Sequence, residues 1–475
     1  MTMGVDNLTM VQQKINYKRI STYYLVGNVF NKGMAFITVP IFTRILSTTD
    51  YGIITTYNSW ISILSMIIGF AMHMGIRAAF IDYREKIDDF MAVTTTFTME
   101  SGIILSFMVL LVVNFINVNL STTLIFLCLL QGISVALMQN YSMYLMMQYR
   151  YRLRTAFMIL PNLLSAIISI IVILFVLKTD LYLGRIVPTA LINILFCILI
   201  LILVYKRSCS FHNKEYLDYG LKISMPLVLH GIALNILSQS DRTMITLLAD
   251  ASQTGIYSLI YNFSMIATVI TTSLEGVWVP WFTNKYKKNE IQDINRLSLD
   301  YVHLMTYIMV GLILIGPEIV KILASKTYWQ GIVIIPPVVL ANYMIFLYTL
   351  YVNVEHFHKK TQYITINTII AAMTNVLLNF LLIPKFGYIA ASYTTLISYS
   401  LALILHARYV KKINKELYPI SIMIPSMLHV IVATVVFYCL MDLWLLRWII
   451  AIAYSLIVLV INKDRLLLLL KTTNK

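Results

Sequence analysis

Residues 156–177, AFMILPNLLSAIISIIVILFVL, and residues 184–205, GRIVPTALINILFCILILILVY, are the stretches that decide the fold. The first has no acidic or basic side chain, and the second has only Arg185. About 20 apolar residues suffice for an α-helix to cross the hydrocarbon core of a bilayer, where the helix satisfies its own backbone hydrogen bonds. Similar segments recur, and the sequence predicts fourteen spanning helices, at about residues 22–43, 53–74, 91–114, 120–145, 156–177, 184–205, 223–247, 255–280, 301–323, 331–353, 363–383, 388–408, 420–441 and 444–462.

The composition of the whole chain supports this interpretation. Of its 475 residues, 59% are hydrophobic and only 12% are charged, about half of the ~25% typical of soluble domains. These values exclude a soluble enzyme, a nucleic-acid-binding domain and a disordered tail. The four cysteines have neither disulfide nor metal-ligand spacing, and no nucleotide-binding or nucleophile motif is present. We therefore expect neither an enzyme nor a bound cofactor or metal.

The basic residues indicate how the chain is oriented in the membrane. If both termini are cytoplasmic, the segments on that side hold 27 of the 36 Lys and Arg residues. Cytoplasmic loops of membrane proteins are enriched in these residues. The net charge of +15 therefore predicts membrane topology, with both termini cytoplasmic, and not a nucleic-acid partner.

Two pairs of similar segments indicate an internal repeat. Residues 46–53 lead from the first helix into the second, and the similar residues 248–256 lead from the seventh into the eighth. Asn162 and Asn375 begin similar apolar stretches in the fifth and eleventh helices. The offset of about six helices predicts an all-α polytopic protein with two parallel six-helix lobes and two additional C-terminal helices. The expected divisions are a tail (1–21), a first lobe (22–205), a loop (206–222), a second lobe (223–408), helices 13 and 14 (420–462) and a second tail (463–475).

Polar residues within the spanning helices are the candidate functional residues, because ionisable groups there cost about 2.5 to 3.5 kcal/mol on insertion scales. The first and seventh helices each carry an amide-rich stripe that ends in a cation. The sequence predicts that the two stripes line a positively charged, water-filled cavity, with hydrogen bonding between helices as the alternative. The predicted cavity residues are Asn28, Asn31, Lys32, Asn235, Gln239 and Arg242.

Three acidic residues are candidates for ion coupling. Glu100 lies near the middle of the third helix, where it could pair with Lys32, bind a coupling ion or remain neutral. Asp241 could bind an ion or balance the charge of Arg242, and Glu275 could be a site or an interfacial residue. The alternatives stay open at this point, with H⁺ or Na⁺ as the coupling ion.

The opening block, Gly27-Asn28-Val-Phe-Asn31-Lys32-Gly33, then Pro40-Ile-Phe-Thr43-Arg44-Ile-Leu46-Ser47 and Asp50-Tyr51-Gly52, resembles a known family. It is similar to the start of bacterial polysaccharide-repeat-unit (Wzx-type) flippases of the multidrug/oligosaccharidyl-lipid/polysaccharide exporter superfamily. Residues 384–394, with Pro384 and Gly387, resemble the turn of that family into the twelfth helix.

The resemblance implies a flippase of the bacterial cytoplasmic membrane. It would move an undecaprenyl-diphosphate-linked oligosaccharide from the cytoplasmic to the outer leaflet by alternating access, for O-antigen, capsule or exopolysaccharide synthesis. Its partners would be this glycan, membrane lipids and a polymerase and chain-length regulator of the same pathway. The alternatives are a cation-coupled multidrug exporter of the same superfamily and a membrane-embedded glycosyltransferase or ligase. Lys32 and Arg242 favour an anionic cargo, and the short predicted loops argue against a transferase.

Overall fold

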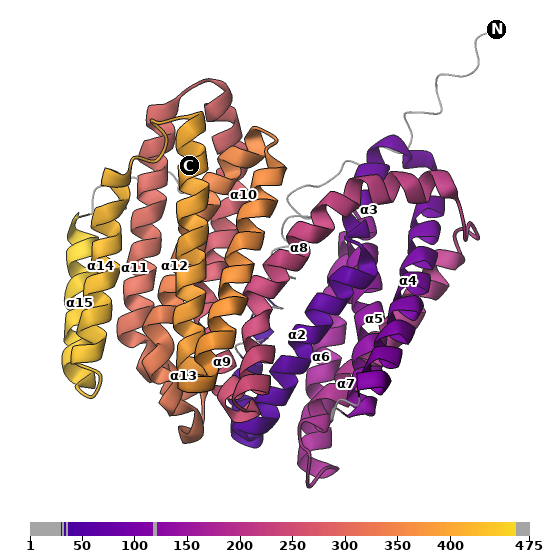
Figure 1. Cartoon of the computed structure of the whole chain (residues 1–475), viewed down its shortest axis with the longest axis horizontal. Helices are drawn as coiled ribbons and strands as arrows, with labels where there is room; N and C mark the ends of the chain where they lie inside the picture. Colours follow the sequence, from indigo (N-terminus) through magenta and orange to yellow (C-terminus); the bar gives the residue numbers. More distant parts are fainter. Residues whose placement is uncertain (1–29, 31–32, 35–36, 117–120, 462–475) are drawn as a thin grey trace. The chain divides into compact units, whose positions relative to one another are not determined.

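The computed structural model describes residues 30, 33–34, 37–116 and 121–461. Within them the chain is helical and contains no strand (Figure 1). Besides a helical segment at residues 37–45, the elements are α2 (Thr48–Gly69), α3 (Met72–Asp82), η2 (Arg84–Lys86), α4 (Ile87–Ile116), α5 (Thr122–Met147), α6 (Tyr151–Phe175), α7 (Leu183–Tyr205), α8 (Lys214–Leu248), α9 (Ala251–Ser264), α10 (Ile266–Lys287), α11 (Ile291–Leu323), η3 (Lys326–Ile334), α12 (Ile335–Phe357), α13 (Thr361–Ile413), α14 (Ile420–Cys439) and α15 (Trp444–Ile461).

The all-α polytopic class predicted from the sequence is confirmed. Ten helical segments of the described chain are long and apolar enough to cross a membrane, and the bent helix α8 makes an eleventh if its two parts form one span. The described residues of each predicted span from residue 53 onward lie mainly on helices, and of the first predicted span, 22–43, only residues 37–43 are described as a continuous helix. The division into two six-helix lobes and two further helices stays a prediction.

Several predicted boundaries differ from the structure. Helix α11 begins at Ile291, ten residues before the predicted start at 301, and the predicted spans 53–74 and 255–280 are each divided between two helices. Helix α8 begins at Lys214, within the predicted loop 206–222, because its first turns are amphipathic and lack the apolar signal of a span. Helix α12 continues to Phe357, past the predicted end at 353. Its last turn is charged in sequence, but Glu355 in that turn is fully buried by protein.

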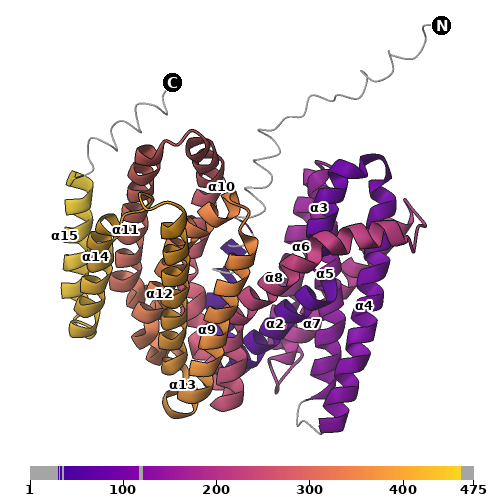
Figure 2. The ribbon, with the colours of Figure 1, turned by 45° about the horizontal axis from the view of Figure 1, so that its top comes forward.

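The described chain forms two compact units. Of the described residues, unit 1 comprises 30, 33–34, 37–38, 64–116, 121–178 and 183–228, and unit 2 comprises 39–63, 179–182 and 229–461. In unit 1, α5 packs against α3, α4 and α7, and α6 packs against α7. In unit 2, α12 packs along α13, while α14 and α15 both pack against α11 (Figures 1 and 2).

The two similar segments noted in the sequence form the same local structure in unit 2. Ser47 and Asp50 exchange hydrogen bonds at the start of α2, and Asp250 accepts the backbone and side-chain amides of Gln253 at the start of α9. At each start the side chain of the capping residue, Ser47 or Asp250, accepts a backbone amide of the first turn, which satisfies a free amide of the helix start. Five residues after the capping residue, each helix has a glycine.

These glycines, Gly52 and Gly255, bring the two helix starts into backbone contact. A Cβ on Gly52 would lie 1.7 Å from the carbonyl oxygen of Ala251, and a Cβ on Gly255 would lie 2.1 Å from that of Thr48. The hydroxyls of Thr48 and Ser252 lie 2.6 Å apart at the same crossing. No side chain larger than hydrogen fits at either position without a backbone shift.

Helix α13 consists of two helices joined at Gly387, as the predicted pair 363–383 and 388–408 requires. Gly387 has φ 59° and ψ −145°, a conformation that side-chain-bearing residues rarely adopt. The backbone amide of Tyr388, freed by the turn, donates to Oε1 of Gln253 over 3.0 Å. We call this end of unit 2, where α2 and α9 also begin, the Gly387 end, and the opposite end, where α13 begins, the Thr361 end.

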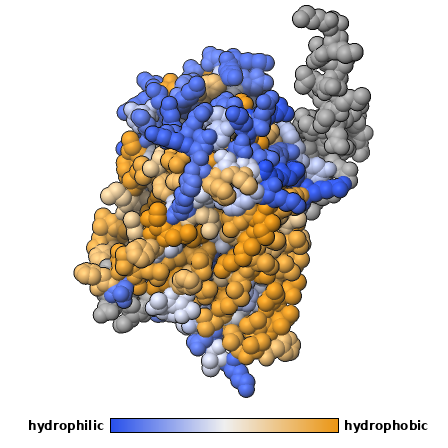
Figure 3. Space-filling view, turned by 90° about the vertical axis from the view of Figure 1, so that its right-hand side faces the viewer, coloured by the Kyte–Doolittle hydropathy of each residue, from blue (hydrophilic) through white to orange (hydrophobic). Residues whose placement is uncertain are grey.

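The surface has the polarity of a membrane protein. One face is hydrophobic over a broad lower band, and hydrophilic residues gather at the top (Figure 3). Many large apolar side chains of the spanning helices are exposed, among them Ile103, Phe107 and Leu111 of α4. In water such a surface would be unfavourable, whereas lipid tails solvate it. The chain is therefore a multi-pass membrane protein.

Candidate functional site

Arg242 lies within helix α8 and is 5% exposed. One Nη atom donates to the carbonyl oxygen of Ser238 and to Oε1 of Gln239, both over 3.0 Å. The guanidinium lies 4.7 Å from the ring centroid of Tyr261, within the range of a cation–π contact. Among the described residues, no carboxylate lies within ion-pair distance of it.

The other predicted polar residues of α8 face helix α2. Asn235 Oδ1 accepts the hydroxyl of Ser62 over 2.6 Å, and the carbonyl oxygen of Gln239 accepts the hydroxyl of Ser59 over 3.1 Å. The structure thus brings Asn235, Gln239 and Arg242 onto one polar surface of α8 and partly engages them in hydrogen bonding between helices. Whether they also bind cargo stays a prediction. The other three predicted cavity residues, Asn28, Asn31 and Lys32, lie outside the described residues.

Asp241 is fully buried at the centre of a polar cluster in unit 2. Its Oδ1 accepts the amide of Asn379 over 2.6 Å, and its Oδ2 accepts the hydroxyls of Thr395 (2.7 Å) and Tyr257 (2.6 Å). Asn379 also bonds Oδ1 of Asn375 over 3.2 Å. Asp241 is therefore held by α9 and by both parts of α13, and no ion pair joins it to Arg242 in the described structure.

This cluster contains only oxygen and amide groups, which include the carboxylate, two side-chain amides and a hydroxyl from Thr395. Oxygen atoms of this kind are the ligands of hard cations such as Na⁺ in transporters. Asp241 is one of the residues that the sequence predicts for ion coupling, whereas Asn375 and Asn379 are not among the predicted site residues. No sequence spacing links residues 134 or more positions apart, so the cluster exists only in the fold.

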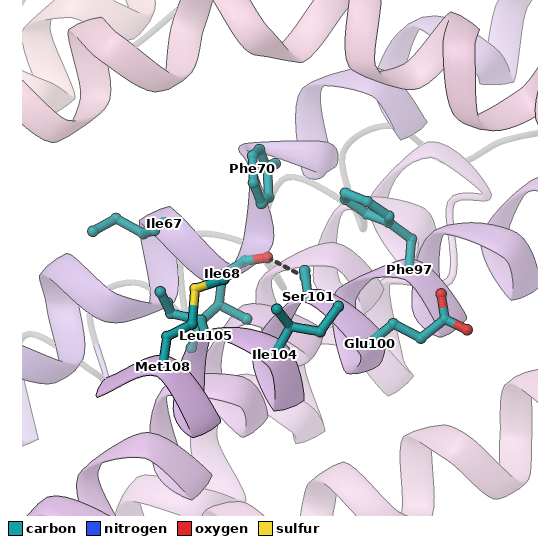
Figure 4. Close-up of a pocket in the computed structure, with 9 residues that line it drawn as sticks. All are labelled: Ile67, Ile68, Phe70, Phe97, Glu100, Ser101, Ile104, Leu105 and Met108. Carbon is teal, nitrogen blue, oxygen red and sulfur yellow. Dashed lines mark hydrogen bonds between the residues drawn. The ribbon is translucent and has the colours of Figure 1, made fainter. Parts of the chain in front are cut away.

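Glu100 lies at the rim of an apolar cavity in unit 1 (Figure 4). The cavity measures about 340 Å³ and is lined mainly by Ile, Phe, Leu and Met side chains of α2 and α4. A break at Phe70 and Ala71, which both have positive φ, separates helix α2 from helix α3. Beside this break, the hydroxyl of Ser101 donates to the carbonyl oxygen of Ile68 over 2.9 Å. This hydrogen bond supplies a partner for a carbonyl group at the end of α2, where the helical hydrogen bonding stops.

The carboxylate of Glu100 lies 2.8 Å from Nε2 of His212, and about half of its side chain is exposed. Its partner in the described structure is therefore a histidine of the segment between α7 and α8. An exposed pair of this type contributes little to stability. The role of Glu100 in ion coupling stays a prediction.

Glu275 lies beside a small internal cavity between α10, α11 and α12. The cavity volume is about 10 Å³, close to the least that holds one water molecule. Trp278 and Asn353 also line it, and the Nε1 and Nδ2 atoms of these residues are buried with no hydrogen-bond partner in the described structure. Glu275 is therefore a partly buried residue of α10, and no second carboxylate lines its cavity.

Two buried charge pairs were missed by the sequence analysis. Glu355 of α12 contacts His406 of α13, and Glu318 of α11 contacts Arg447 of α15. Glu318 falls in the predicted span 301–323, so its charge was a signal that could have found it. Glu355 falls between the predicted spans 331–353 and 363–383, and it lies 51 residues from His406, so no local pattern joins the two residues.

A bundle of spanning helices that contains interrupted helices and buried charges at mid-helix is the architecture of membrane transporters and flippases. The chain belongs to the family of polysaccharide biosynthesis proteins, which it matches over residues 18–285. The family resemblance inferred from the opening block is thereby confirmed. The chain is also 23% identical over 345 residues to Lsg locus putative protein 1 of Haemophilus influenzae, covering 69% of this chain and 84% of that protein.

Solved structures with the same fold include the lipid II flippase MurJ in an inward closed conformation. It has a TM-score of 0.66 and 17% identity, and the match covers 93% of this chain and 99% of that one. An inward-facing multidrug resistance MATE family transporter of the MOP superfamily has a TM-score of 0.61 and 11% identity, over 81% and 96% of the chains. A MOP superfamily transporter from Pyrococcus furiosus has a TM-score of 0.54 and 11% identity, over 82% and 96%. The fold is therefore that of the MOP superfamily.

Proposed function

We propose that this protein is a flippase that moves an undecaprenyl-diphosphate-linked oligosaccharide from the cytoplasmic to the outer leaflet by alternating access. The polymer would be an O-antigen, a capsule or an exopolysaccharide, in the cytoplasmic membrane of a bacterium. Family membership and the MOP superfamily fold support transport of a lipid-linked polysaccharide precursor. No catalytic group is assigned, because the proposed work is translocation.

The observation that carries this proposal is Arg242. A guanidinium buried within a spanning helix is costly without an anionic partner, and the described residues supply no carboxylate to pair with it. Its planar fork matches the oxygens of a diphosphate. Asn235 and Gln239, on the same helix, are suitable hydrogen-bonding groups for sugar hydroxyls. Cargo would replace the present contacts of Arg242 with Gln239 and Ser238.

Of the three carboxylates considered for ion coupling, we propose Asp241 as the site and Na⁺ as the ion. Glu100 is half exposed and paired with a histidine. The oxygen-bearing side chains that line the cavity beside Glu275 are those of Asn353, Tyr301 and two threonines, and none of them is a carboxylate. Asp241 is fully buried and accepts hydrogen bonds from Asn379 and Thr395, which lie on the two parts of α13. A cation there would be held by Asp241 together with Asn375, Asn379 and Thr395.

The test is translocation by the purified full chain in liposomes. A fluorescent undecaprenyl-diphosphate oligosaccharide is placed in one leaflet, and its appearance in the other is followed with a membrane-impermeant quencher. We expect translocation by the wild type and a loss of at least about tenfold in Arg242→Ala, in line with removal of a charged contact worth ~1.5–3 kcal/mol. Arg408→Ala, which removes an exposed arginine of α13, is the matched control and should retain the rate.

The alternative is export of organic cations by the same fold. The apolar cavity beside Glu100 is the observation that favours it, because a carboxylate at the rim of an apolar pocket suits a cationic amphiphile. Liposomes loaded with ethidium test this directly. Saturable ethidium transport that depends on Glu100, without movement of the lipid-linked oligosaccharide, would replace the flippase proposal.

A further inference from the structure

Glu355 and His406 form an ionisable pair inside the helix bundle of unit 2. Nδ1 of His406 lies 2.8 Å from Oε2 of Glu355, and their side chains are 1% and 0% exposed, respectively. The pair joins the last turn of α12 to the last turns of α13, towards the Thr361 end. Neither residue takes part in the site around Asp241 or Arg242, and an ionisable pair buried at this depth needs a reason.

The surroundings of the pair suit the binding of a second proton. Oε1 of Glu355 is buried and has no hydrogen-bond partner in the described structure. The ring of Tyr348 stacks on the imidazole of His406, with centroids 5.6 Å apart and an interplanar angle of 19°. An aromatic face stabilises a neighbouring cation. One partner thus has a free acceptor oxygen, and the other has a ring face for an imidazolium.

A second buried pair in unit 2 serves as a comparison, because it consists of residues that cannot change their charge together. Glu318 contacts Arg447, whose side chain is 0% exposed, and Trp448 donates to the second oxygen of Glu318 over 3.2 Å. Arginine does not lose its proton in proteins, and both carboxylate oxygens are occupied. In the Glu355 pair, both partners can titrate and one oxygen is free, so this pair can change its charge.

We propose that Glu355 and His406 form a proton-binding site that alternates between one and two bound protons. With one proton, shared between Oε2 and Nδ1, the pair is neutral. The second proton forms an O–H bond at Oε1 of Glu355, while the first stays on His406 as an imidazolium beneath Tyr348. The net charge of the pair then becomes +1. Release of that proton restores the neutral pair, and no other reactant is involved.

The site is distinct from the Asp241 cluster but shares helix α13 with it. Thr395, which bonds Asp241, and His406 are eleven residues apart on one helix, or about 16 Å at 1.5 Å per residue. Tyr348 also stacks on Tyr399, with centroids 6.2 Å apart, so aromatic rings occupy the space between them. The titratable groups that face the pair are His356 on α12, Tyr409 on α13 and His230 on α8, and Glu275 on α10 faces Tyr348.

The first experiment measures proton binding itself and does not depend on transport. Infrared difference spectra of the full chain in liposomes are recorded between pH 8 and pH 5. We expect the carbonyl band of a buried protonated carboxylic acid in the wild type and in Glu318→Gln, and loss of that band in Glu355→Gln. The amide of Gln keeps the size of the side chain and can still contact His406. An unchanged band in Glu355→Gln, or no band in the wild type, would overturn the proposal.

The second experiment tests the role of the site in transport and rests on the proposed function. A gradient of one pH unit is a tenfold ratio of proton concentration, so coupling to one proton changes the accumulation ratio of cargo up to about tenfold. Glu355→Gln and His406→Gln should translocate cargo without this dependence, whereas Glu318→Gln should retain it. If the infrared band is present but no lipid-linked oligosaccharide moves, the proton site stands and the flippase function fails. If cargo moves with an unaltered pH dependence in both variants, the pair does not couple protons to transport.

Discussion

Replacing Asp241 by Asn tests the proposed sodium site most directly. In the structure the carboxylate accepts three hydrogen bonds, from Asn379, Thr395 and Tyr257. A hydrogen bond to a charged group contributes about 1.5–3 kcal/mol and a neutral one about 0.5–1.5 kcal/mol. Losing the charge therefore costs roughly 1 kcal/mol per bond, or about 3 kcal/mol in total. Since proteins unfold at a cost of about 5–15 kcal/mol, the variant should fold with reduced stability.

The assay is thermal unfolding of the purified protein with Na⁺, compared with K⁺ at equal ionic strength. A ligand at 100 times its dissociation constant stabilises the folded state by about 2.7 kcal/mol. We expect a saturable Na⁺-specific gain in the wild type and none in Asp241→Asn. The comparison is made within each variant, so lower baseline stability does not affect it. Asp250→Asn is the control, because Asn caps a helix about as well as Asp and the residue is exposed.

Two results would refute a sodium site at Asp241. If Na⁺ stabilises Asp241→Asn as strongly as the wild type, the ion binds elsewhere in the chain. If Na⁺ and K⁺ act equally on the wild type, the oxygen cluster is a structural network that holds α8, α9 and α13 together. Asp241→Ala is a poorer test, because it leaves three buried donors unsatisfied at about 1–3 kcal/mol each.

Three further predictions concern other parts of the chain. Cysteines in place of Thr48 and Ser252, whose hydroxyls lie 2.6 Å apart, should form a disulfide under oxidation. If alternating access requires the contact between α2 and α9 to open, this disulfide should stop translocation until a reductant is added, and undiminished translocation by the oxidised protein would contradict such an opening. Gly255→Ala should destabilise the protein by about 1–3 kcal/mol, because the added Cβ would meet the carbonyl oxygen of Thr48. The control is Gly311→Ala, whose added Cβ would meet open space; in the same unfolding assay it should be neutral or stabilising. Glu100→Gln should change stability by less than about 1 kcal/mol and leave the Na⁺ and pH dependence of translocation intact, and loss of either dependence would return Glu100 to the coupling site.

The helices and their order were predictable because their signal is local. Each span is a run of apolar residues long enough for a bilayer, and the turn at Gly387 follows from a proline and a glycine in sequence. The similar segments 46–53 and 248–256 were also visible, and the structure shows them as two capped helix starts that meet at Gly52 and Gly255. The start of α8 and the end of α12 were less predictable. The first turns of α8 are not an apolar run, and the last turn of α12 contains a charged residue that is buried by protein.

The candidate site was predictable only in part. Arg242, Asp241, Glu100 and Glu275 could be selected one by one, since a charge within a spanning helix is conspicuous in any sequence. Their partners could not. Asn379 lies 138 residues from Asp241, and no pattern in the sequence connects them.

By itself, the sequence determined that this is a polytopic helical membrane protein of a polysaccharide biosynthesis family, because hydropathy and the opening motif are properties of neighbouring residues. The tertiary structure alone decided which charges are paired. It separated Glu100, half exposed beside His212, from Asp241, fully buried among donors of α9 and α13. It also brought Glu355 to His406 across 51 residues. The physical reason is that burial and hydrogen-bond partners are set by packing between distant helices.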